Sequence, residues 1–342
     1  MLHASSRTVL AVLLAMYCAT PARAGEDDPA RSVTLPADDA AHDNQAIEWW
    51  YYTAHLHTCD GKRYGVQLVF FQFPLDAEHL GSATTFAVTD LNGAEPQFAQ
   101  ESLSQPVGFP ATPGSIDLRL ATDTRLLSAS GRNGHDHLQA ELSGYAIDLE
   151  LDSQKPPALH GDDGIVSFPS GDDHYYSRTR MAVRGTLKVR GEPLQVTGVA
   201  WFDHQYGAQP AVSWTWFSVQ LSSREELMVY HWFTPAGDRS STLASFVSRG
   251  GKTRNLQADQ VALTQLDTWL SPTTNIAYGK RWRIRIAAEE LDLTITSRLP
   301  GSELLPPGQL PYIEADSDVS GTRKGKPVHG YAFAEQVFQP DQ

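Results

Sequence analysis

Short segments rich in β-branched and aromatic residues follow one another along most of the chain, and this pattern restricts the fold more than any other feature. No window of a dozen or more residues carries the apolar stripe of an amphipathic helix. The segments with strand character are 47–58, 64–73, 137–151, 175–189, 194–203, 214–221, 226–233, 282–287, 291–297 and 331–338. Many strands separated by turns predict an all-β fold, an antiparallel sandwich or barrel with little helix.

A faint internal repeat indicates that the chain has two related halves. Trp49–Leu56 aligns without gaps on Trp214–Leu221, with the first and last residues identical and the third and fourth aromatic in both. The length of 342 residues also suggests two domains, at about 150 residues each. We therefore predict two β-domains, over residues 25–207 and 208–342.

The first residues have the organisation of a secretory signal peptide. His3 and Arg7 precede an apolar run over residues 9–19, and an Ala-x-Ala site ends at Ala24. The run is shorter than the roughly 20 apolar residues that a transmembrane helix needs. We predict a signal peptide over residues 1–24, cleaved after Ala24, and a periplasmic or secreted protein.

Composition and missing motifs exclude several classes of function. The net charge of −13 disfavours binding to nucleic acid, while 41% hydrophobic residues are enough for a sizeable core. The chain has no Gly-x-Ser-x-Gly elbow, phosphate-binding glycine loop, His-Glu-x-x-His motif or cysteine pair for zinc. We expect no metal and no cofactor.

Two further features have both a structural and a functional interpretation. Cys59, the one cysteine left after cleavage, lies in a predicted turn, and we interpret it as a tolerated turn residue, the alternative being a reactive thiol. His55 and His57, like His135 and His137, are two residues apart and share a strand face, a spacing compatible with a metal. We interpret both pairs as solvated residues at hairpin ends.

The segment 198–207 places a carboxyl group beside an indole. Strand alternation puts Trp201 and Asp203 on one face and His204 on the other. Burial in this apolar stretch would disfavour the carboxylate of Asp203, and a neutral carboxyl near pH 7 can act as a general acid. The alternative is a structural aspartate that caps the following turn.

Two other segments place polar groups among aromatic side chains. His174 and Tyr176 share a face of one predicted strand, and Glu48, Trp50 and Tyr52 share a face of another. The first pair is also compatible with an exposed strand start. Because a carboxylate among aromatics is costly unless it is paired, Glu48 either makes a structural hydrogen bond or lines a site.

At these segments the chain resembles the two-domain lipocalin-like family that includes carotenoid 1,2-hydratases and AttH-like proteins. The resemblance covers nearly the whole mature chain. Its motifs are His42, Glu48-Trp49-Trp50-Tyr51, Phe70-Phe71, Tyr175-Tyr176-Ser177, Gly185, Ala200-Trp201-Phe202-Asp203-His204, Gly207, Trp214-x-Trp216-Phe217, Glu226-Leu227-Met228, Trp269 and Trp282-x-Ile284. The resemblance implies two lipocalin-like β-domains of eight to ten strands, packed side by side with an apolar pocket at or near their junction.

The resemblance also implies a set of catalytic residues. His174 and Asp203 match a histidine and an aspartate thought to carry the chemistry of the hydratases, and Tyr176 and Trp201 match two aromatic positions where the hydratases carry Trp and Tyr. In this scheme Asp203 donates a proton to carbon, His174 orients water or returns the proton, and the aromatics stabilise a cation. The residues predicted to bind the ligand are Glu48, Trp50, Tyr52, His204, Trp214, Trp216 and His231.

Two hypotheses about function follow. The first is an exported, cofactor-independent hydratase-like enzyme that hydrates or isomerises a double bond of an apolar isoprenoid-like molecule. The second is a periplasmic carrier that binds a lipid or other apolar ligand without catalysis and serves as an accessory protein of a membrane transporter. Both have an apolar small molecule as the partner and involve no nucleic acid.

Overall fold

The computed structural model describes residues 31–208, 211–299, 302–306 and 310–339. The predicted signal peptide and its cleavage site lie outside these residues. The described residues form β-strands and three single-turn 3-10 helices, η2 (Ala37–Asp39), η3 (Ala258–Gln260) and η4 (Ala287–Glu289). No helix in this part of the chain has the length and apolar character needed to cross a membrane. The all-β fold predicted from the strand pattern is confirmed.

The first half of the chain forms one antiparallel sheet, which we call sheet A. Its strand order is β4-β3-β2-β1-β12-β11-β8-β7-β6-β5, and β9 and β10 pair with β11. The strands are β1 (Ile47–His57), β2 (Arg63–Pro74), β3 (Leu80–Asp90), β4 (Gln97–Gln105), β5 (Ile116–Ala121), β6 (Leu126–Arg132), β7 (His135–Leu142), β8 (Tyr145–Ser153), β9 (Ala158–Leu159), β10 (Ile165–Phe168), β11 (Gly171–Val189) and β12 (Glu192–Gly207).

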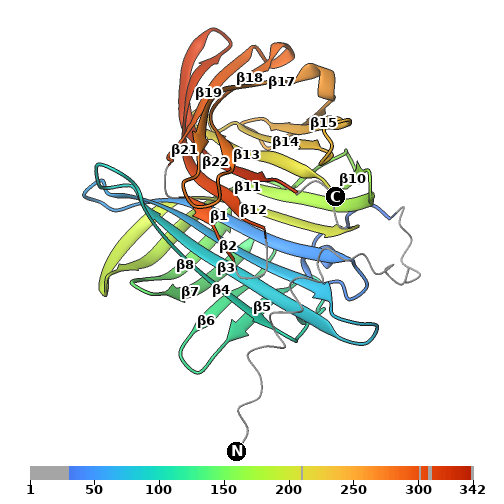
Figure 1. The fold of residues 1–342 in the computed structure, drawn as a ribbon, viewed down its shortest axis with the longest axis vertical. Helices are drawn as coiled ribbons and strands as arrows, with labels where there is room; N and C mark the ends of the chain where they lie inside the picture. The colour runs from blue at the N-terminus through green and yellow to red at the C-terminus, as the bar shows by residue number, and fades with distance from the viewer. Residues whose placement is uncertain (1–30, 209–210, 300–301, 307–309, 340–342) are drawn as a thin grey trace, which may run out of the picture.

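The second half forms sheet B, with the order β16-β15-β14-β13-β22-β21-β19-β18-β17 and β20 paired with β21. The strands are β13 (Ser213–Leu221), β14 (Glu226–Phe233), β15 (Ser240–Val247), β16 (Thr253–Leu256), β17 (Ala262–Leu270), β18 (Ala277–Ile286), β19 (Leu291–Ser297), β20 (Glu303–Leu304), β21 (Tyr312–Arg323) and β22 (Lys326–Val337). Both sheets are strongly curved and lie against each other (Figure 1).

The two sheets repeat one strand order, which accounts for the repeat in the sequence. In sheet A, β1 lies between β2 and β12, and in sheet B, β13 lies between β14 and β22. The aligned segments 49–56 and 214–221 therefore occupy corresponding strands. The cross-strand partners also correspond, since Tyr51 lies opposite Asp203 and Trp216 lies opposite Glu335.

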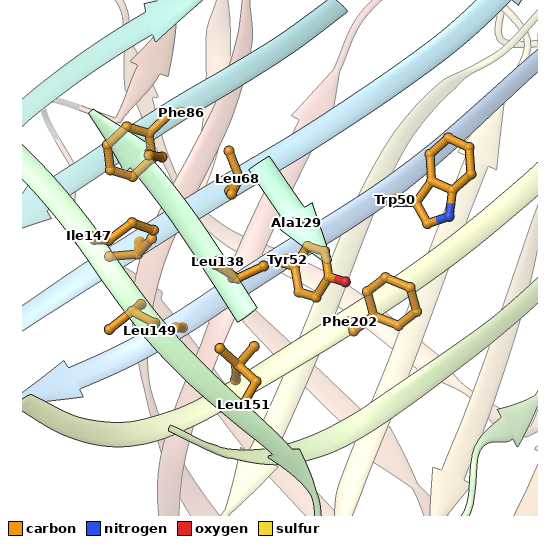
Figure 2. Packing of buried hydrophobic residues seen from close by; sticks show 14 of the residues in the cluster. Trp50, Tyr52, Leu68, Phe86, Ala129, Leu138, Ile147, Leu149, Leu151 and Phe202 are labelled. Carbon is orange, nitrogen blue, oxygen red and sulfur yellow. The ribbon is translucent and has the colours of Figure 1, made fainter. Parts of the chain in front are cut away.

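Strand alternation separates the buried side chains of sheet A into two sets. Trp50, Tyr52 and Phe202 point to the concave side, where they join a core that also contains Leu68, Phe86, Leu138, Ile147 and Leu149 (Figure 2). The residues between them in sequence point the other way, toward sheet B. This is why most of β1 and the end of β12, residues 200–207, are buried on both faces.

Aromatic side chains and buried ion pairs join the two sheets. Tyr51 and Trp201 of sheet A pack in one cluster with Trp216 of sheet B. At another point Glu226 of β14 bonds both the Lys155 ammonium and the Arg180 guanidinium, each at 2.5 Å. These three aromatic residues come from β1, β12 and β13, so the strands bury side chains against each other at the junction.

The histidine pairs do not share a ligand in the structure. His135 and His137 lie at the surface and bond Asp152 and Asp148 at 2.7 and 2.8 Å, as solvated residues would. The interpretation is wrong for His55, which is buried at the junction, where its Nδ1 lies 2.6 Å from an Asp316 carboxylate oxygen of sheet B. Cys59 is exposed.

Candidate active site at the junction of the sheets

A cavity of about 140 Å³ lies between the two sheets. Aromatic side chains form much of its wall, and its polar residues include two carboxyl groups, one from each sheet. The aromatic residues are Trp49, Tyr51, Phe71, Tyr175, Trp214, Trp216, Tyr230 and Tyr312, and the carboxyl groups belong to Asp203 and Glu335. We call this cavity the junction pocket. Trp214 and Trp216, predicted to bind a ligand, are part of its wall.

Asp203 is held in the junction pocket by three side chains of sheet A. The Trp201 indole donates to Oδ1 at 2.6 Å, the Tyr175 hydroxyl donates to Oδ2 at 2.8 Å, and the Ser177 hydroxyl also bonds Oδ1. Trp216 of sheet B in turn donates to the Tyr175 hydroxyl at 3.0 Å. Burial raises the pKa of Asp203 to about 7 because its charged form is poorly solvated there.

Sheet B contributes two carboxyl groups at the positions that correspond to Asp203 and Ser177 of sheet A. Glu335 lies opposite Glu314 on β22 and β21, as Asp203 lies opposite Ser177 on β12 and β11. Trp214 donates to Glu335 at 2.9 Å, and the Tyr51 hydroxyl donates to Glu314 at 2.6 Å. Burial raises the pKa of Glu335 to about 7, and that of Glu314 also lies well above its usual range.

The structure separates Asp203 from two of the residues predicted to act with it. The register of β11 and β12 places Tyr176 opposite His204 and Ser177 opposite Asp203. Because opposed residues of an antiparallel pair share a face, His174 and Tyr176 point away from the junction pocket. The prediction that His174 and Tyr176 contact a substrate together with Asp203 therefore does not agree with the structure. A match of motifs does not show which face of the sheet each residue occupies.

His174 and Tyr176 instead make structural contacts on the concave side of sheet A. The His174 ring stacks on Tyr206 with 4.6 Å between centroids, and its Nε2 lies 2.8 Å from the carbonyl oxygen of Arg31. The Tyr176 hydroxyl donates to Asp39 at 2.5 Å. Asp39 also accepts two hydrogen bonds from the buried Arg178 guanidinium, at 2.8 and 2.9 Å.

The other predicted residues of β1 and β12 also lie inside sheet A. Glu48 accepts hydrogen bonds from the backbone N–H of His42 and lies 2.7 and 2.8 Å from ring nitrogens of His42 and His204. Trp50 stacks on His204, and the Tyr52 hydroxyl donates to Asp136. Glu48 is thus a paired, hydrogen-bonded group, the first of the two alternatives that the sequence left open.

The group of His42, Glu48 and His204 is the one cluster of metal-ligating side chains found in the described part of the chain. Its members already bond one another. Burial opposes protonation of His42, but bonds to Asp38 and Glu48 raise its pKa to about 9, so the imidazole is charged at neutral pH. A charged imidazole paired with a carboxylate is a structural ion pair, and we assign no metal to it.

His231 lines a different cavity, of about 570 Å³, in sheet B. It lies there with Thr242, whose hydroxyl is 3.0 Å from the His231 Nδ1, and with Trp282. The structure therefore does not bring His231 to the junction pocket.

Sequence reasoning missed Tyr175 and Glu335, which line the junction pocket, and Ser177, which bonds Asp203 without lining the cavity. Tyr175 and Ser177 alternate with the predicted His174 and Tyr176, so the correct segment was found with the wrong face. Glu335 could have been found by extending the repeat to the strand that pairs with Trp214–Leu221.

Comparison with known proteins places the chain in a family. The model of the AttH-like family matches residues 26–335. The fold is similar to that of an AttH protein from Nitrosomonas europaea, with a TM-score of 0.77 and 25% identity over 91% of this chain and 99% of the other. No curated protein matches the chain.

Two more distant structures share the fold. Kievitone hydratase from Nectria haematococca has a TM-score of 0.72 and 18% identity, over 90% of this chain and 94% of its own. CghA, crystallised with Sch210972, has a TM-score of 0.62 and 14% identity, over 92% and 96% of the two chains. Motifs, strand order and family match agree, and the chain belongs to the AttH-like family.

Proposed function

We propose that this protein is a cofactor-independent, hydratase-like enzyme that adds water to, or isomerises, a double bond of an apolar isoprenoid-like molecule in the junction pocket. One observation carries the proposal: the buried carboxyl group of Asp203, whose pKa is raised by burial to about 7, faces a cavity lined by many aromatic rings. A neutral acid and a water-poor, electron-rich wall are what protonation of an unactivated double bond requires.

The first step would be proton transfer from Asp203 to one carbon of the double bond. The π electrons form the new C–H bond, the Asp203 carboxylate is left behind, and the other carbon becomes a cation. Trp49, Trp214 and Trp216 line the same cavity, and each aromatic face stabilises a nearby desolvated cation by about 0.5–2 kcal/mol.

The second step would be attack of water on that cation. Glu335 comes from the opposite sheet and lines the same cavity. Among the described residues it accepts a hydrogen bond from Trp214, and no basic side chain pairs with it. In its ionised form it accepts a proton from the attacking water, and an O–H group is left on carbon. Loss of a proton from the neighbouring carbon to Asp203 gives isomerisation instead.

The pocket dimensions favour a small molecule or one end of a longer one. A volume of about 140 Å³ is less than the roughly 300–1,000 Å³ that drug-sized ligands occupy. The kinship in fold with kievitone hydratase supports a hydration, although its substrate is not carried over to this chain.

Extraction of the purified protein with organic solvent, followed by mass spectrometry, tests this function. The extracted compound and a panel of short isoprenoid alkenes are then incubated with the protein in water labelled with oxygen-18. Uptake of one labelled oxygen, or a shifted double bond, is the expected result. A stoichiometric lipid that returns unaltered under all these conditions would contradict the enzyme and support the carrier.

We also propose that the protein is exported, on the signal-peptide pattern of its first 24 residues. Fractionation of expressing cells and amino-terminal sequencing test this. The mature chain should begin at Gly25 in the exported fraction, and a soluble cytoplasmic chain that keeps residues 1–24 would contradict the proposal.

A further inference from the structure

We propose that a buried chain of hydrogen bonds, from Asp203 through Ser177, His160 and Ser245 to Asn255, holds one proton on Asp203. In this account His160 and Ser245 are positioning residues, which set the protonation of the acid without touching the substrate. The inference deepens the proposed function, because it explains how the acid of the junction pocket is kept loaded with a proton.

This chain of hydrogen bonds runs from sheet A into sheet B through mostly buried side chains. Ser177 bonds Asp203, and its hydroxyl oxygen lies 2.7 Å from His160 Nε2. His160 Nδ1 lies 2.7 Å from the hydroxyl of Ser245, which in turn bonds the side-chain oxygen of Asn255. His160, Ser177 and Ser245 are fully buried, and Asp203 is 4% exposed.

Asn255 fixes the direction of the chain at its far end. The Asn255 side-chain nitrogen donates to the Leu159 carbonyl oxygen at 3.1 Å and to an Asp162 carboxylate oxygen at 2.9 Å. A flipped amide would point its oxygen at two acceptors. The Asn255 oxygen therefore faces Ser245, and because it has no hydrogen, Ser245 must be the donor.

Counting hydrogens then shows that the chain needs one more proton than its neutral members supply. There are four links between the five side chains, and each link takes one hydrogen. Ser177, Ser245 and a neutral His160 supply three. The fourth must come from Asp203 as a carboxylic acid or from His160 as an imidazolium.

The fourth hydrogen is on Asp203 because protonation of the buried His160 ring is unfavourable. Burial alone lowers the pKa of His160 to about 3, and its ring contacts Tyr175 and two neutral hydroxyls rather than a carboxylate. His160 is therefore neutral, with its hydrogen on Nδ1 and its Nε2 accepting from Ser177. Ser177 has then no hydrogen left for Asp203, so Asp203 donates to Ser177.

Ionisation of Asp203 leaves one of the four links without a hydrogen, with two acceptors facing each other. A hydrogen bond is worth about 0.5–1.5 kcal/mol, which corresponds to a pKa difference of roughly 1 unit. The chain thus raises the pKa of Asp203 beyond the effect of burial alone.

Other groups also face Asp203, and one of them, Tyr175, contacts the His160 ring as well. Tyr175 and Trp201 donate to its carboxyl group, and the charges of Glu314 and Glu335 act on it from sheet B. Burial and the charges of these carboxyl groups also raise the pKa of the nearby Tyr51 hydroxyl. None of them bonds Ser245 or Asn255 among the described contacts, so changes at the far end of the chain leave them in place.

Nitrogen-15 NMR of the ligand-free protein, labelled at histidine, tests the direction of the chain. His160, identified by its loss in His160→Gln, is expected to be neutral with hydrogen on Nδ1. Ser245→Ala removes the acceptor for that hydrogen, and the proton is expected to move to Nε2. Hydrogen on Nε2 in the unchanged protein would overturn the proposal.

Infrared titration of the carbonyl band of protonated carboxyl groups measures the acid directly, with the Asp203 band assigned by its absence in Asp203→Asn. Ser245→Ala leaves two links and two hydrogens, so the pKa of Asp203 is expected to fall by about 1 unit. Asn255→Leu, which leaves three links and three hydrogens, is expected to lower it equally. An unchanged pKa in both variants would overturn the proposal.

Gln220→Met is the matched control. Gln220 is buried and donates across the junction to the carbonyl oxygens of Thr179 and Ala200, at 2.8 and 2.9 Å, without touching the chain. Its loss should leave the pKa of Asp203 unchanged. These measurements need no substrate, so a failure of the chain is distinguishable from a failure of the hydratase function.

Discussion

Asp203 illustrates how far single residues could be assigned from the sequence. Alternation placed Trp201 and Asp203 on one face, and the indole does donate to the carboxyl group. The raised pKa has the expected cause, burial in an apolar stretch. Tyr175 and Ser177 could not be assigned in the same way, because their approach to Asp203 depends on the register between β11 and β12, which a local pattern does not contain.

At this scale the account predicts a pH dependence of turnover. Asp203 acts in its protonated form, and burial raises its pKa to about 7. The value of kcat/KM on a verified substrate should therefore be lower on the alkaline side, falling about tenfold per pH unit above pH 7. Rates measured from pH 5 to pH 9 check this, and a rate that rises steadily with pH would contradict an acid role.

Strands were predicted where their patterns are strong. Residues 47–58 and 64–73 correspond to β1 and β2, whose faces are both buried. β4 was not predicted, because its side chains are half-exposed and its residues, such as Gln97 and Glu101, are polar. The segment 137–151 was read as one unit, although a turn at residues 143–144 divides it into β7 and β8.

The segment with η2 is predicted to stabilise sheet A through one buried ion pair. Asp39→Asn leaves the Arg178 guanidinium buried without its carboxylate, a change that costs about 3–5 kcal/mol in other proteins. Urea unfolding should show a loss of that size. Arg184→Met, which removes an exposed pair with Asp152, should cost less than about 1 kcal/mol. Equal effects of the two variants would contradict the assignment.

For the whole molecule, the repeat and the resemblance predicted two β-domains side by side with an apolar pocket at or near their junction, but not which residues meet there. The junction depends on contacts between residues far apart in sequence, such as His55 with Asp316 and Lys155 with Glu226. No local pattern marks these as partners. The repeat relates Glu335 to Asp203, but that these two residues line one cavity follows from the packing of one sheet on the other.

The ion cluster at the junction should couple the two sheets. Glu226→Gln removes the carboxylate that pairs with the buried Lys155 ammonium and with the partly exposed Arg180 guanidinium. Leaving Lys155 buried without a carboxylate should cost about 3 kcal/mol or more. Unfolding followed by circular dichroism and by tryptophan fluorescence should give one transition in the unchanged protein, displaced to lower denaturant in the variant. An unaltered midpoint would contradict this role.

Stability should also depend on pH through the buried carboxyl groups. Burial raises the pKa of Asp136 to about 6, of Asp203 and Glu335 to about 7, and of Asp173 to about 8. Their unfolded values are near 4, so their contribution is fully present below about pH 4 and is lost as the pH rises through 6 to 8. The Tm should fall between pH 5 and pH 9, and a Tm that rises over this range would contradict it.

The central claim, that Asp203 is the acid of an enzyme, is tested most directly by Asp203→Asn on a verified substrate. Asparagine keeps the shape, and its one side-chain oxygen can still accept from Trp201, while its amide nitrogen takes the Oδ2 position beside the Tyr175 hydroxyl. It has no acidic proton for carbon. The account predicts turnover reduced by about 100-fold or more, with ligand affinity and Tm nearly unchanged. Turnover equal to that of the unchanged protein, with the variant folded and ligand bound, would contradict it.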